Sequence, residues 1–302
     1  MPSAHNHLPQ RVAITGASGL IGSALLGHLK SEGHTVQRLV RRKTVAADEV
    51  FWDPIKGEID LEPLRGVEAI IHLAGANVGD RRWTKKYRAE ILNSRLLGTT
   101  TIAKAANEVK PAVVVSASAI GWYGETGNRA VNESDRAGDD FLATVCREWE
   151  AAADSITNSR VVKIRTGLVL EPTGGALGKM LPLFKFGLGG KLGSGKQWWS
   201  WITLHDQIKA ICFLLEKNIE GAVNLTSPNP ATNQEFTAAL ARALRRPAIF
   251  PVPGFALKLA LGGFSTEILG SKRVLPQKLL DAGFTFDYPH LAPALSELVD
   301  LQ

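Results

Sequence analysis

Thr15-Gly16-Ala17-Ser18-Gly19-Leu20-Ile21-Gly22 is the stretch that decides the fold, because it places three glycines between a β-rich run and a helical pattern. Arg11–Thr15 reads RVAIT, and apolar residues recur at helical spacing from Leu20 onward. The first glycine permits a tight turn, the second lets backbone approach a pyrophosphate, and the third lets the helix pack close to the sheet. The stretch therefore predicts a dinucleotide-binding loop, with a purely structural turn as the alternative. The residues expected to contact the cofactor here are Gly16, Ser18, Gly19, Leu20, Ile21 and Gly22.

Apolar runs alternate with helical patterns along most of the chain. Such alternation predicts an α/β fold, a Rossmann-type doubly wound parallel sheet. We expect a nucleotide-binding domain over 11–170 and a smaller α+β, substrate-side region over 171–302 that can return strands to the main sheet. Segment 51–66, with Pro54 and Gly57, is expected to form surface turns, and Asp139 is expected to cap a helix reaching Ile156. The stretch 160–170, RVVKIRTGLVL, is expected to hold the next strand.

Composition narrows the class of protein. The 302 residues are 45% hydrophobic and include only two cysteines, Cys146 and Cys212, which favours a globular protein of a reducing, cytoplasmic compartment without a disulfide framework or a metal site. The longest apolar stretch near the end, 249–264, is interrupted by Pro251, Pro253 and Lys258, so no membrane span is expected. The net charge of +6 comes from scattered basic pairs, which predicts no nucleic-acid partner. A small-molecule substrate is the expected partner, and oligomerisation is left open.

The end of the second predicted strand indicates which dinucleotide binds. An NAD site usually has a carboxylate there, which hydrogen-bonds the ribose 2′-hydroxyl. This chain has Arg41 and Arg42 instead. Two guanidiniums can hold a 2′-phosphate through paired hydrogen bonds, so NADP(H) is the predicted cofactor. A solvated basic strand end is the alternative interpretation.

Three strand ends carry a family resemblance. TGASGLIG, the HLAGA at 72–76 and the SASAIGWYG at 116–124 resemble an extended short-chain dehydrogenase/reductase. The chain is most similar to an atypical, epimerase-like branch, because it also has RRWT at 81–84, SRLLGT at 94–99, a Trp-Glu pair at 149–150 and a small C-terminal domain from about 247.

That resemblance implies roles for particular residues. Leu73, Ala74 and Gly75 would lie against the adenine and ribose, and Ser118 would contact the substrate oxygen. Ser116 and Arg165 follow buried strands at the carboxyl edge, where open α/β sheets bind ligands, so both are expected beside the cofactor. The alternative for the two serines is that they merely finish a strand.

One part of the family pattern is missing. The wider family uses a Tyr-x-x-x-Lys pair for proton transfer, and Leu142 and Cys146 occupy those positions here. Tyr123 follows the serine strand and is the candidate proton donor, with aromatic packing as the alternative. Arg95 replaces the asparagine of N-x-x-G-T. Two functions follow: an NADP(H)-dependent oxidoreductase or epimerase-like enzyme, or a non-catalytic NADP(H) sensor or partner-binding protein.

Overall fold

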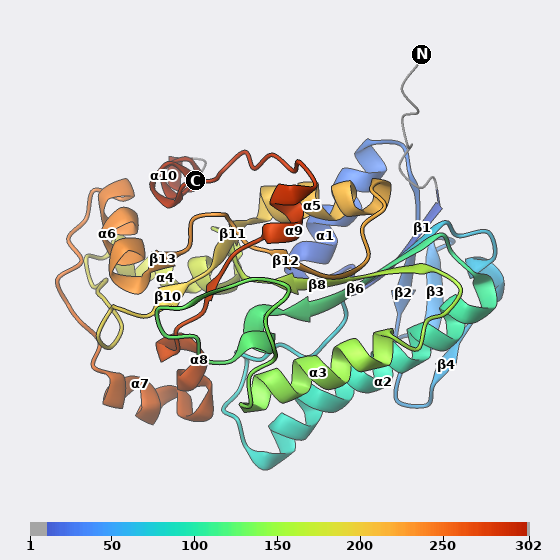
Figure 1. The fold of residues 1–302 in the computed structure, drawn as a ribbon, viewed down its shortest axis with the longest axis horizontal. Helices are drawn as coiled ribbons and strands as arrows, with labels where there is room; N and C mark the ends of the chain where they lie inside the picture. Colours follow the sequence, from blue (N-terminus) through green and yellow to red (C-terminus); the bar gives the residue numbers. More distant parts are fainter. Residues whose placement is uncertain (1–10, 301–302) are drawn as a thin grey trace.

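The computed structural model describes residues 11–300 and is built around one eight-stranded sheet in the order β12-β8-β6-β5-β1-β2-β3-β4 (Figure 1). Neighbouring strands are parallel except at one edge, where β4 is antiparallel to β3. The first strand lies inside the sheet and the chain adds strands on both of its sides, so the predicted doubly wound α/β class is confirmed. The strands are β1 (Arg11–Thr15), β2 (Thr35–Val40), β3 (Glu49–Asp53), β4 (Glu58–Ile59), β5 (Ala69–His72), β6 (Val113–Ala119), β8 (Arg160–Thr166) and β12 (Gly221–Leu225).

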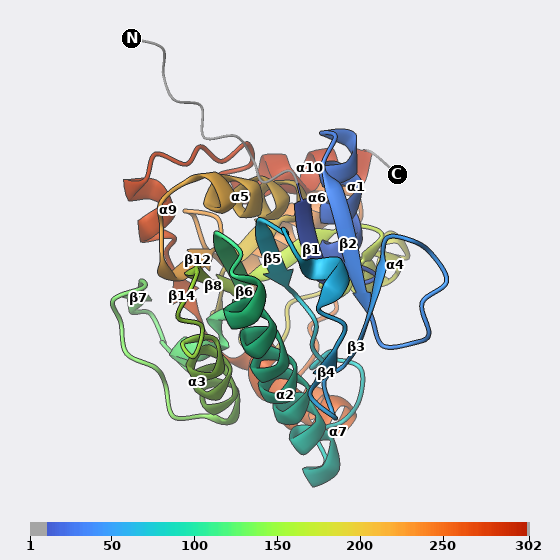
Figure 2. The same ribbon diagram turned by 90° about the vertical axis from the view of Figure 1, so that its right-hand side faces the viewer.

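Helices cover both faces of this sheet (Figure 2). On one face α1 (Leu20–Ser31) packs beside α5 (Leu204–Glu216), and on the other α2 (Lys85–Val109) packs beside α3 (Phe141–Ala153). The strands between them are buried on both sides, which explains why β6 begins with three consecutive valines. Short 3₁₀ helices cover Glu62–Leu64 (η1), Ile120–Tyr123 (η2) and Gly262–Phe264 (η3).

The C-terminal region has its own apolar core around Trp201 and Phe236, yet it is joined to the main sheet. Its strand β12 lies at the sheet edge beside β8, and its strand β14 pairs with β7 from the first half of the chain. The remaining elements are β7 (Ala130–Val131), β9 (Leu168–Glu171), α4 (Gly175–Lys185), β10 (Trp198–Trp199), β11 (Trp201–Thr203), β13 (Ala231–Thr232), α6 (Asn233–Ala243), α7 (Gly254–Leu261), α8 (Ser265–Leu269), β14 (Arg273–Val274), α9 (Gln277–Asp281) and α10 (Leu291–Asp300).

Two local expectations were wrong. Segment 51–66 contains the end of β3 and all of β4, because Trp52 is buried while the turn residues next to it hide the alternation of a short edge strand. The cap of α3 is Asp140 rather than Asp139: its carboxylate accepts from the Ala143 amide at 2.8 Å, and the helix ends at Ala153 rather than Ile156. The stretch 160–170 holds the expected strand as β8, and after Gly167 the chain leaves the main sheet and pairs as β9 with β11.

Across residues 11–300, none of the helices has both the length and the apolar character needed to cross a bilayer.

Candidate dinucleotide and substrate site

The glycine loop folds so tightly that two of its glycines cannot carry a side chain. A Cβ on Gly22 would collide with the carbonyl oxygen of Gly16. Gly16 itself has a φ of +71°, and a Cβ there would lie 3.0 Å from the carbonyl carbon of Leu73 and the amide nitrogen of Ala74. The loop therefore brings the end of β1, the start of α1 and the end of β5 into backbone contact.

The N-terminus of α1 presents amides to an anion. Its N-cap is Gly19, and no side chain within residues 11–300 caps the helix. First-turn amides have no carbonyl partner in an α-helix, and Leu20 and Ile21 carry two of them here. Ser18 is exposed directly before this turn. A pyrophosphate fits this arrangement, because free amides and the helix dipole both favour negative charge.

A buried threonine and histidine fix the neighbouring strand ends. Thr15 Oγ1 accepts from the amides of Leu73 and Ala74 at 3.0 and 3.1 Å, and it lies 2.7 Å from Nδ1 of His72. Burial lowers the pKa of His72 to about 4, so the ring is neutral at neutral pH. The Thr15 hydroxyl therefore donates to Nδ1, and Nε2–H donates to Thr99 Oγ1, 3.1 Å away. This network holds Leu73 and Ala74 against Gly16.

Arg95 supports the loop after β5. Its Nη1 donates to the Ala76 carbonyl at 2.9 Å, and its guanidinium lies 4.8 Å from the Trp149 ring centroid. A Cβ on Gly75 would lie 3.4 Å from Cζ of Arg95, so the two fit closely. The residue that departs from the N-x-x-G-T pattern thus holds the backbone of this loop.

The two arginines after β2 differ in their surroundings. Arg42 is held by Glu49 of β3 through two hydrogen bonds of 2.5 and 2.8 Å, and Glu49 is buried. The Arg42 hydrogen bonds lower the pKa of Glu49 to about 2. Arg41 is exposed and makes no hydrogen bond or ion pair with any residue of 11–300. Arg41 is therefore the guanidinium available to a ligand, and Arg42 is anchored.

A buried polar cluster lies at the other half of the carboxyl edge. Ser118, Arg165 and Asn224 are adjacent in register on β6, β8 and β12. Glu150 of α3 accepts from Ser118 Oγ at 2.7 Å and from Arg165 Nε and Nη2 at 2.8 and 2.9 Å. The Glu150 and Arg165 side chains are each only 4% exposed. The cluster therefore contains a buried ion pair, and the Ser118 hydroxyl is hydrogen-bonded to the carboxylate of that pair.

Tyr123 completes this cluster from η2. Its hydroxyl donates to Asn224 Oδ1 at 2.8 Å and accepts from Arg165 Nη1 at 3.0 Å. Burial raises the pKa of Tyr123 to about 12, so the phenol is a weak acid. The Arg165 guanidinium also lies 3.8 Å from the Trp122 ring centroid. These contacts favour supporting roles for Tyr123 and Arg165, and their predicted roles at the substrate and cofactor stay predictions.

Ser116 lies two residues before Ser118 on the same face of β6. It is paired in register with His72 and is buried, and its hydroxyl has no partner within residues 11–300. A buried unpaired hydroxyl is uncommon in proteins. Its predicted contact with the cofactor stays a prediction.

One face of α3 carries the residues that stand where the Tyr-x-x-x-Lys pair is expected. Leu142, Cys146 and Glu150 follow each other at intervals of four, so they share a face. Leu142 and Cys146 pack against Gly121, and burial raises the pKa of the Cys146 thiol to about 12, which makes it unreactive. The charged group on this face is Glu150, one turn beyond the position expected for lysine.

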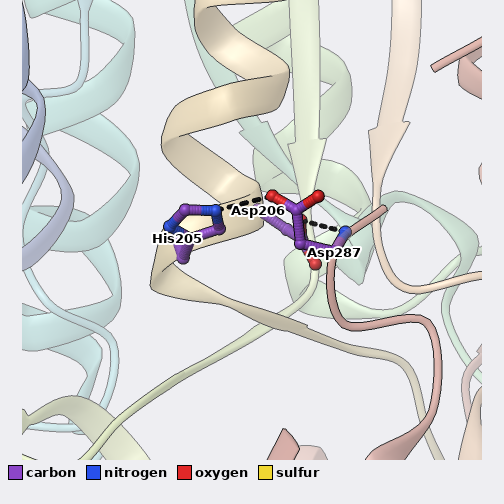
Figure 3. A group of neighbouring side chains, drawn as sticks. All are labelled: His205, Asp206 and Asp287. Atoms are coloured by element: carbon purple, nitrogen blue, oxygen red, sulfur yellow. Dashed lines mark hydrogen bonds and ion pairs between the residues drawn. The ribbon is translucent and has the colours of Figure 1, made fainter. Parts of the chain in front are cut away.

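His205, Asp206 and Asp287 form the one group of metal-ligand residue types found among residues 11–300 (Figure 3). Asp206 accepts from the amides of Asp287 and Tyr288, both at 2.9 Å. Asp287 pairs with His205 Nε2 at 2.7 Å and with Lys209 at 2.5 Å. All four carboxylate oxygens have protein partners, so the group fastens the segment before α10 to the start of α5.

Three residues of the site were not expected from the sequence: Glu49, Glu150 and Asn224. Glu150 was visible as part of the Trp-Glu pair, and its spacing from Leu142 and Cys146 was the signal that could have placed it on their face. Glu49 and Asn224 gave no local signal, because each meets its partner only through strand pairing.

Comparison with known proteins identifies relatives along nearly the whole chain. Residues 12–148 match the NAD dependent epimerase/dehydratase family, and residues 252–298 match a domain of unknown function, DUF1731. An epimerase family protein of Mycobacterium bovis is 44% identical over 94% of this chain and 96% of its own. The crystal structure of a human epimerase family protein with NADPH has a TM-score of 0.89 and 33% identity over 97% of this chain and 100% of that chain. A nucleoside-diphosphate sugar epimerase structure from Corynebacterium glutamicum has a TM-score of 0.78 and 33% identity, covering 97% of this chain and 59% of that chain.

Proposed function

Because this chain belongs to the NAD dependent epimerase/dehydratase family, we propose that it is an NADP(H)-dependent oxidoreductase or epimerase-like enzyme acting on a small molecule. The observation that carries the proposal is the close backbone packing of Gly16 and Gly22 beside the uncapped start of α1. Such packing lets the backbone approach a pyrophosphate closely, and the free amides of the helix start favour its negative charge. The relative crystallised with NADPH supports the choice of dinucleotide.

The proposed cofactor contacts follow the geometry. The amides from Ser18 to Gly22 hold the pyrophosphate, and the Leu73–Gly75 backbone borders the adenosine, where Thr15 and Arg95 fix it. Arg41 binds the 2′-phosphate, and Arg42 shapes the loop through Glu49. Ser116 and Arg165 are proposed to border the nicotinamide end. When bound, the dinucleotide accepts or supplies hydride at its nicotinamide ring.

Ser118 is proposed to handle the proton. Its single proton already points to the Glu150 carboxylate, so its lone pairs can only accept a hydrogen bond. A substrate alcohol would therefore donate to Ser118 Oγ. As the alcohol carbon loses hydride, the alcohol proton passes to Ser118 and the Ser118 proton passes to Glu150. The reverse transfers accompany carbonyl reduction, so protons balance in both directions.

Arg165, Tyr123 and Asn224 are proposed to position this relay. Arg165 binds both carboxylate oxygens of Glu150 and keeps them oriented. Tyr123 and Asn224 hold the guanidinium from its other edge. In this account Tyr123 supports the proton path through Arg165 and is not itself the donor, a refinement of the role first assigned to it.

A non-catalytic NADP(H)-binding protein is the second candidate. It is favoured by one observation: Leu142 and Cys146 stand where the wider family has its proton-transfer pair, and both are buried apolar contacts. In that case, NADPH would change which proteins associate with the chain, and no substrate would turn over.

A two-stage experiment tests both candidates. The first stage follows NADPH binding by fluorescence and thermal melting; failure to bind overturns both. The second stage measures NADPH oxidation with a panel of carbonyl compounds, including nucleoside-diphosphate keto-sugars. We expect Ser118→Ala and Glu150→Gln to bind NADPH normally and to turn over about 100-fold more slowly, and the exposed Ser23→Ala to match the wild type. Normal binding, no turnover and NADPH-dependent protein partners would favour the sensor.

We also propose that the protein works in the cytoplasm. Its two cysteines are both buried free thiols, as a reducing compartment allows. Subcellular fractionation tests this assignment.

A further inference from the structure

A basic cavity is lined by residues of α6, by the segment that follows α6 and by Lys191. Its volume is about 780 Å³, within the range of small-molecule sites. Four cationic side chains line it: Lys191, Arg242, Arg245 and Arg246. None of the lining residues belongs to the nucleotide loop or the Ser118 cluster. Figure 1 shows α6 at the end of the molecule opposite β2, β3 and β4.

The cations of this α6 cavity are not neutralised by the protein. No aspartate or glutamate lines the cavity, and none of the four cations forms an ion pair with any residue between 11 and 300. Three guanidiniums and one ammonium thus share one concave surface. Such a concentration of positive charge attracts an anion that carries more than one negative charge.

Local backbone structure brings these residues together. Beyond the last helical residue of α6, Arg245 has a φ of +52°, and the Arg246 amide donates to the Ala241 carbonyl at 3.0 Å. Glycine is the usual residue at such a helix end, and a residue with a side chain is strained there. A helix dipole accounts for cations in this last turn. It does not account for Lys191, which reaches the same cavity from a separate segment, with its stem over Gly195.

The rest of the cavity lining is mostly apolar, with Gln234 and Thr237 as its uncharged polar residues. Ala238, Ala241, Pro247, Ala248 and Ile249 contribute its apolar lining, and Ile249 is 71% exposed. Guanidinium groups match the geometry of phosphate oxygens, and a phosphomonoester carries nearly two negative charges near neutral pH. We propose that the α6 cavity binds a phosphomonoester attached to an apolar body, as a second site separate from the dinucleotide site.

Binding of hexyl phosphate to the full chain, measured by calorimetry and NMR, tests the site. We expect millimolar or tighter affinity that weakens with added salt, and no binding of hexanol. Arg245→Gly/Arg246→Gln should weaken hexyl phosphate binding at least tenfold and leave NADPH binding unchanged. Glycine suits the backbone at 245, so this variant is expected to fold.

The matched control removes the same charge elsewhere. Lys110 also has a φ of +52° after its helix, and Lys104 lies on the same helix, α2. Lys110→Gly/Lys104→Gln should bind hexyl phosphate as the wild type does. Absence of hexyl phosphate binding to the wild type, or equal weakening in both double variants, overturns the proposal.

Vesicles of phosphatidylcholine with phosphatidic acid distinguish two sources of the phosphomonoester. Co-sedimentation that hexyl phosphate reverses assigns the site to a lipid headgroup. Hexyl phosphate binding without co-sedimentation assigns it to a soluble phosphomonoester.

Discussion

The two halves of the sheet's carboxyl edge are built in different ways. Around β1 and β5 the surface is made of backbone: glycines, helix amides and a loop fixed by Thr15 and His72. Around β6, β8 and β12 it is made of charged and polar side chains from five separate elements, centred on Glu150 and Arg165. The first half depends on the absence of side chains at particular positions, and the second depends on the presence of every partner.

The largest expected effect comes from adding one methyl group to the glycine loop of the backbone half. In Gly22→Ala the new Cβ meets the Gly16 carbonyl, which is backbone and cannot move aside. We expect the unfolding free energy to fall by more than about 4 kcal/mol and NADPH binding to be lost. Gly27→Ala in the same helix has open space and should gain up to about 1 kcal/mol. Urea unfolding and NADPH titration check both, and equal behaviour of the two variants would contradict the packing argument.

Removing one partner should break the side-chain half. Glu150→Ala leaves the Arg165 guanidinium buried without its counter-charge, which costs about 3–5 kcal/mol of unfolding free energy. The control is Glu62→Ala, which breaks an exposed ion pair with Arg65 and should cost less than about 1 kcal/mol. Chemical denaturation measures both. A small loss of unfolding free energy in Glu150→Ala would mean that water reaches the Arg165 guanidinium.

His72, which links β5 to Thr15 of β1, should make the free energy of unfolding depend on pH. Its pKa is about 4 in the folded protein and about 6.5 when unfolded, so between these values only the unfolded chain binds a proton. This contribution is fully present above pH 6.5, and about 3 kcal/mol is lost as pH falls to 4. We expect His72→Gln to have a flatter stability profile from pH 7 to 4, and the exposed His28→Gln to retain the wild-type slope. An unchanged slope in His72→Gln would show that other groups cause it.

The smallest expected effect concerns the choice of cofactor. Arg41→Gln should weaken NADPH binding about tenfold and leave NADH binding unchanged, because only NADPH has the 2′-phosphate. Arg42→Gln should have a smaller effect on this preference, since Glu49 already occupies its guanidinium. Fluorescence titrations with NADPH and NADH measure this preference in each variant. A larger effect at Arg42 would reverse the roles given to the two residues.

The difference between the backbone half and the side-chain half also explains which parts of the site could be predicted from the sequence. The glycines that permit the loop lie within eight residues, so their spacing alone indicated the nucleotide half and the fold class. Glu150, Arg165 and Asn224 come together only when α3 packs on the sheet and β12 joins β8. Their residue types could be read from the sequence but their partners could not, so the ion pair between Arg165 and Glu150 was not anticipated and Asn224 was overlooked. The short strand β3 and the edge strand β4 were missed because turn residues outweighed a single alternation around Trp52.

The position of β12 has a consequence for synthesis of the chain. β8 leaves the ribosome well before β12, with β9, α4, β10, β11 and α5 made in between. Until β12 arrives, β8 is an open edge, and open edges can pair with other chains. The Arg165 side chain on β8 meanwhile lacks Asn224, which later holds it through Tyr123. We therefore expect nascent chains stalled before residue 221 to be prone to aggregation and to need chaperones.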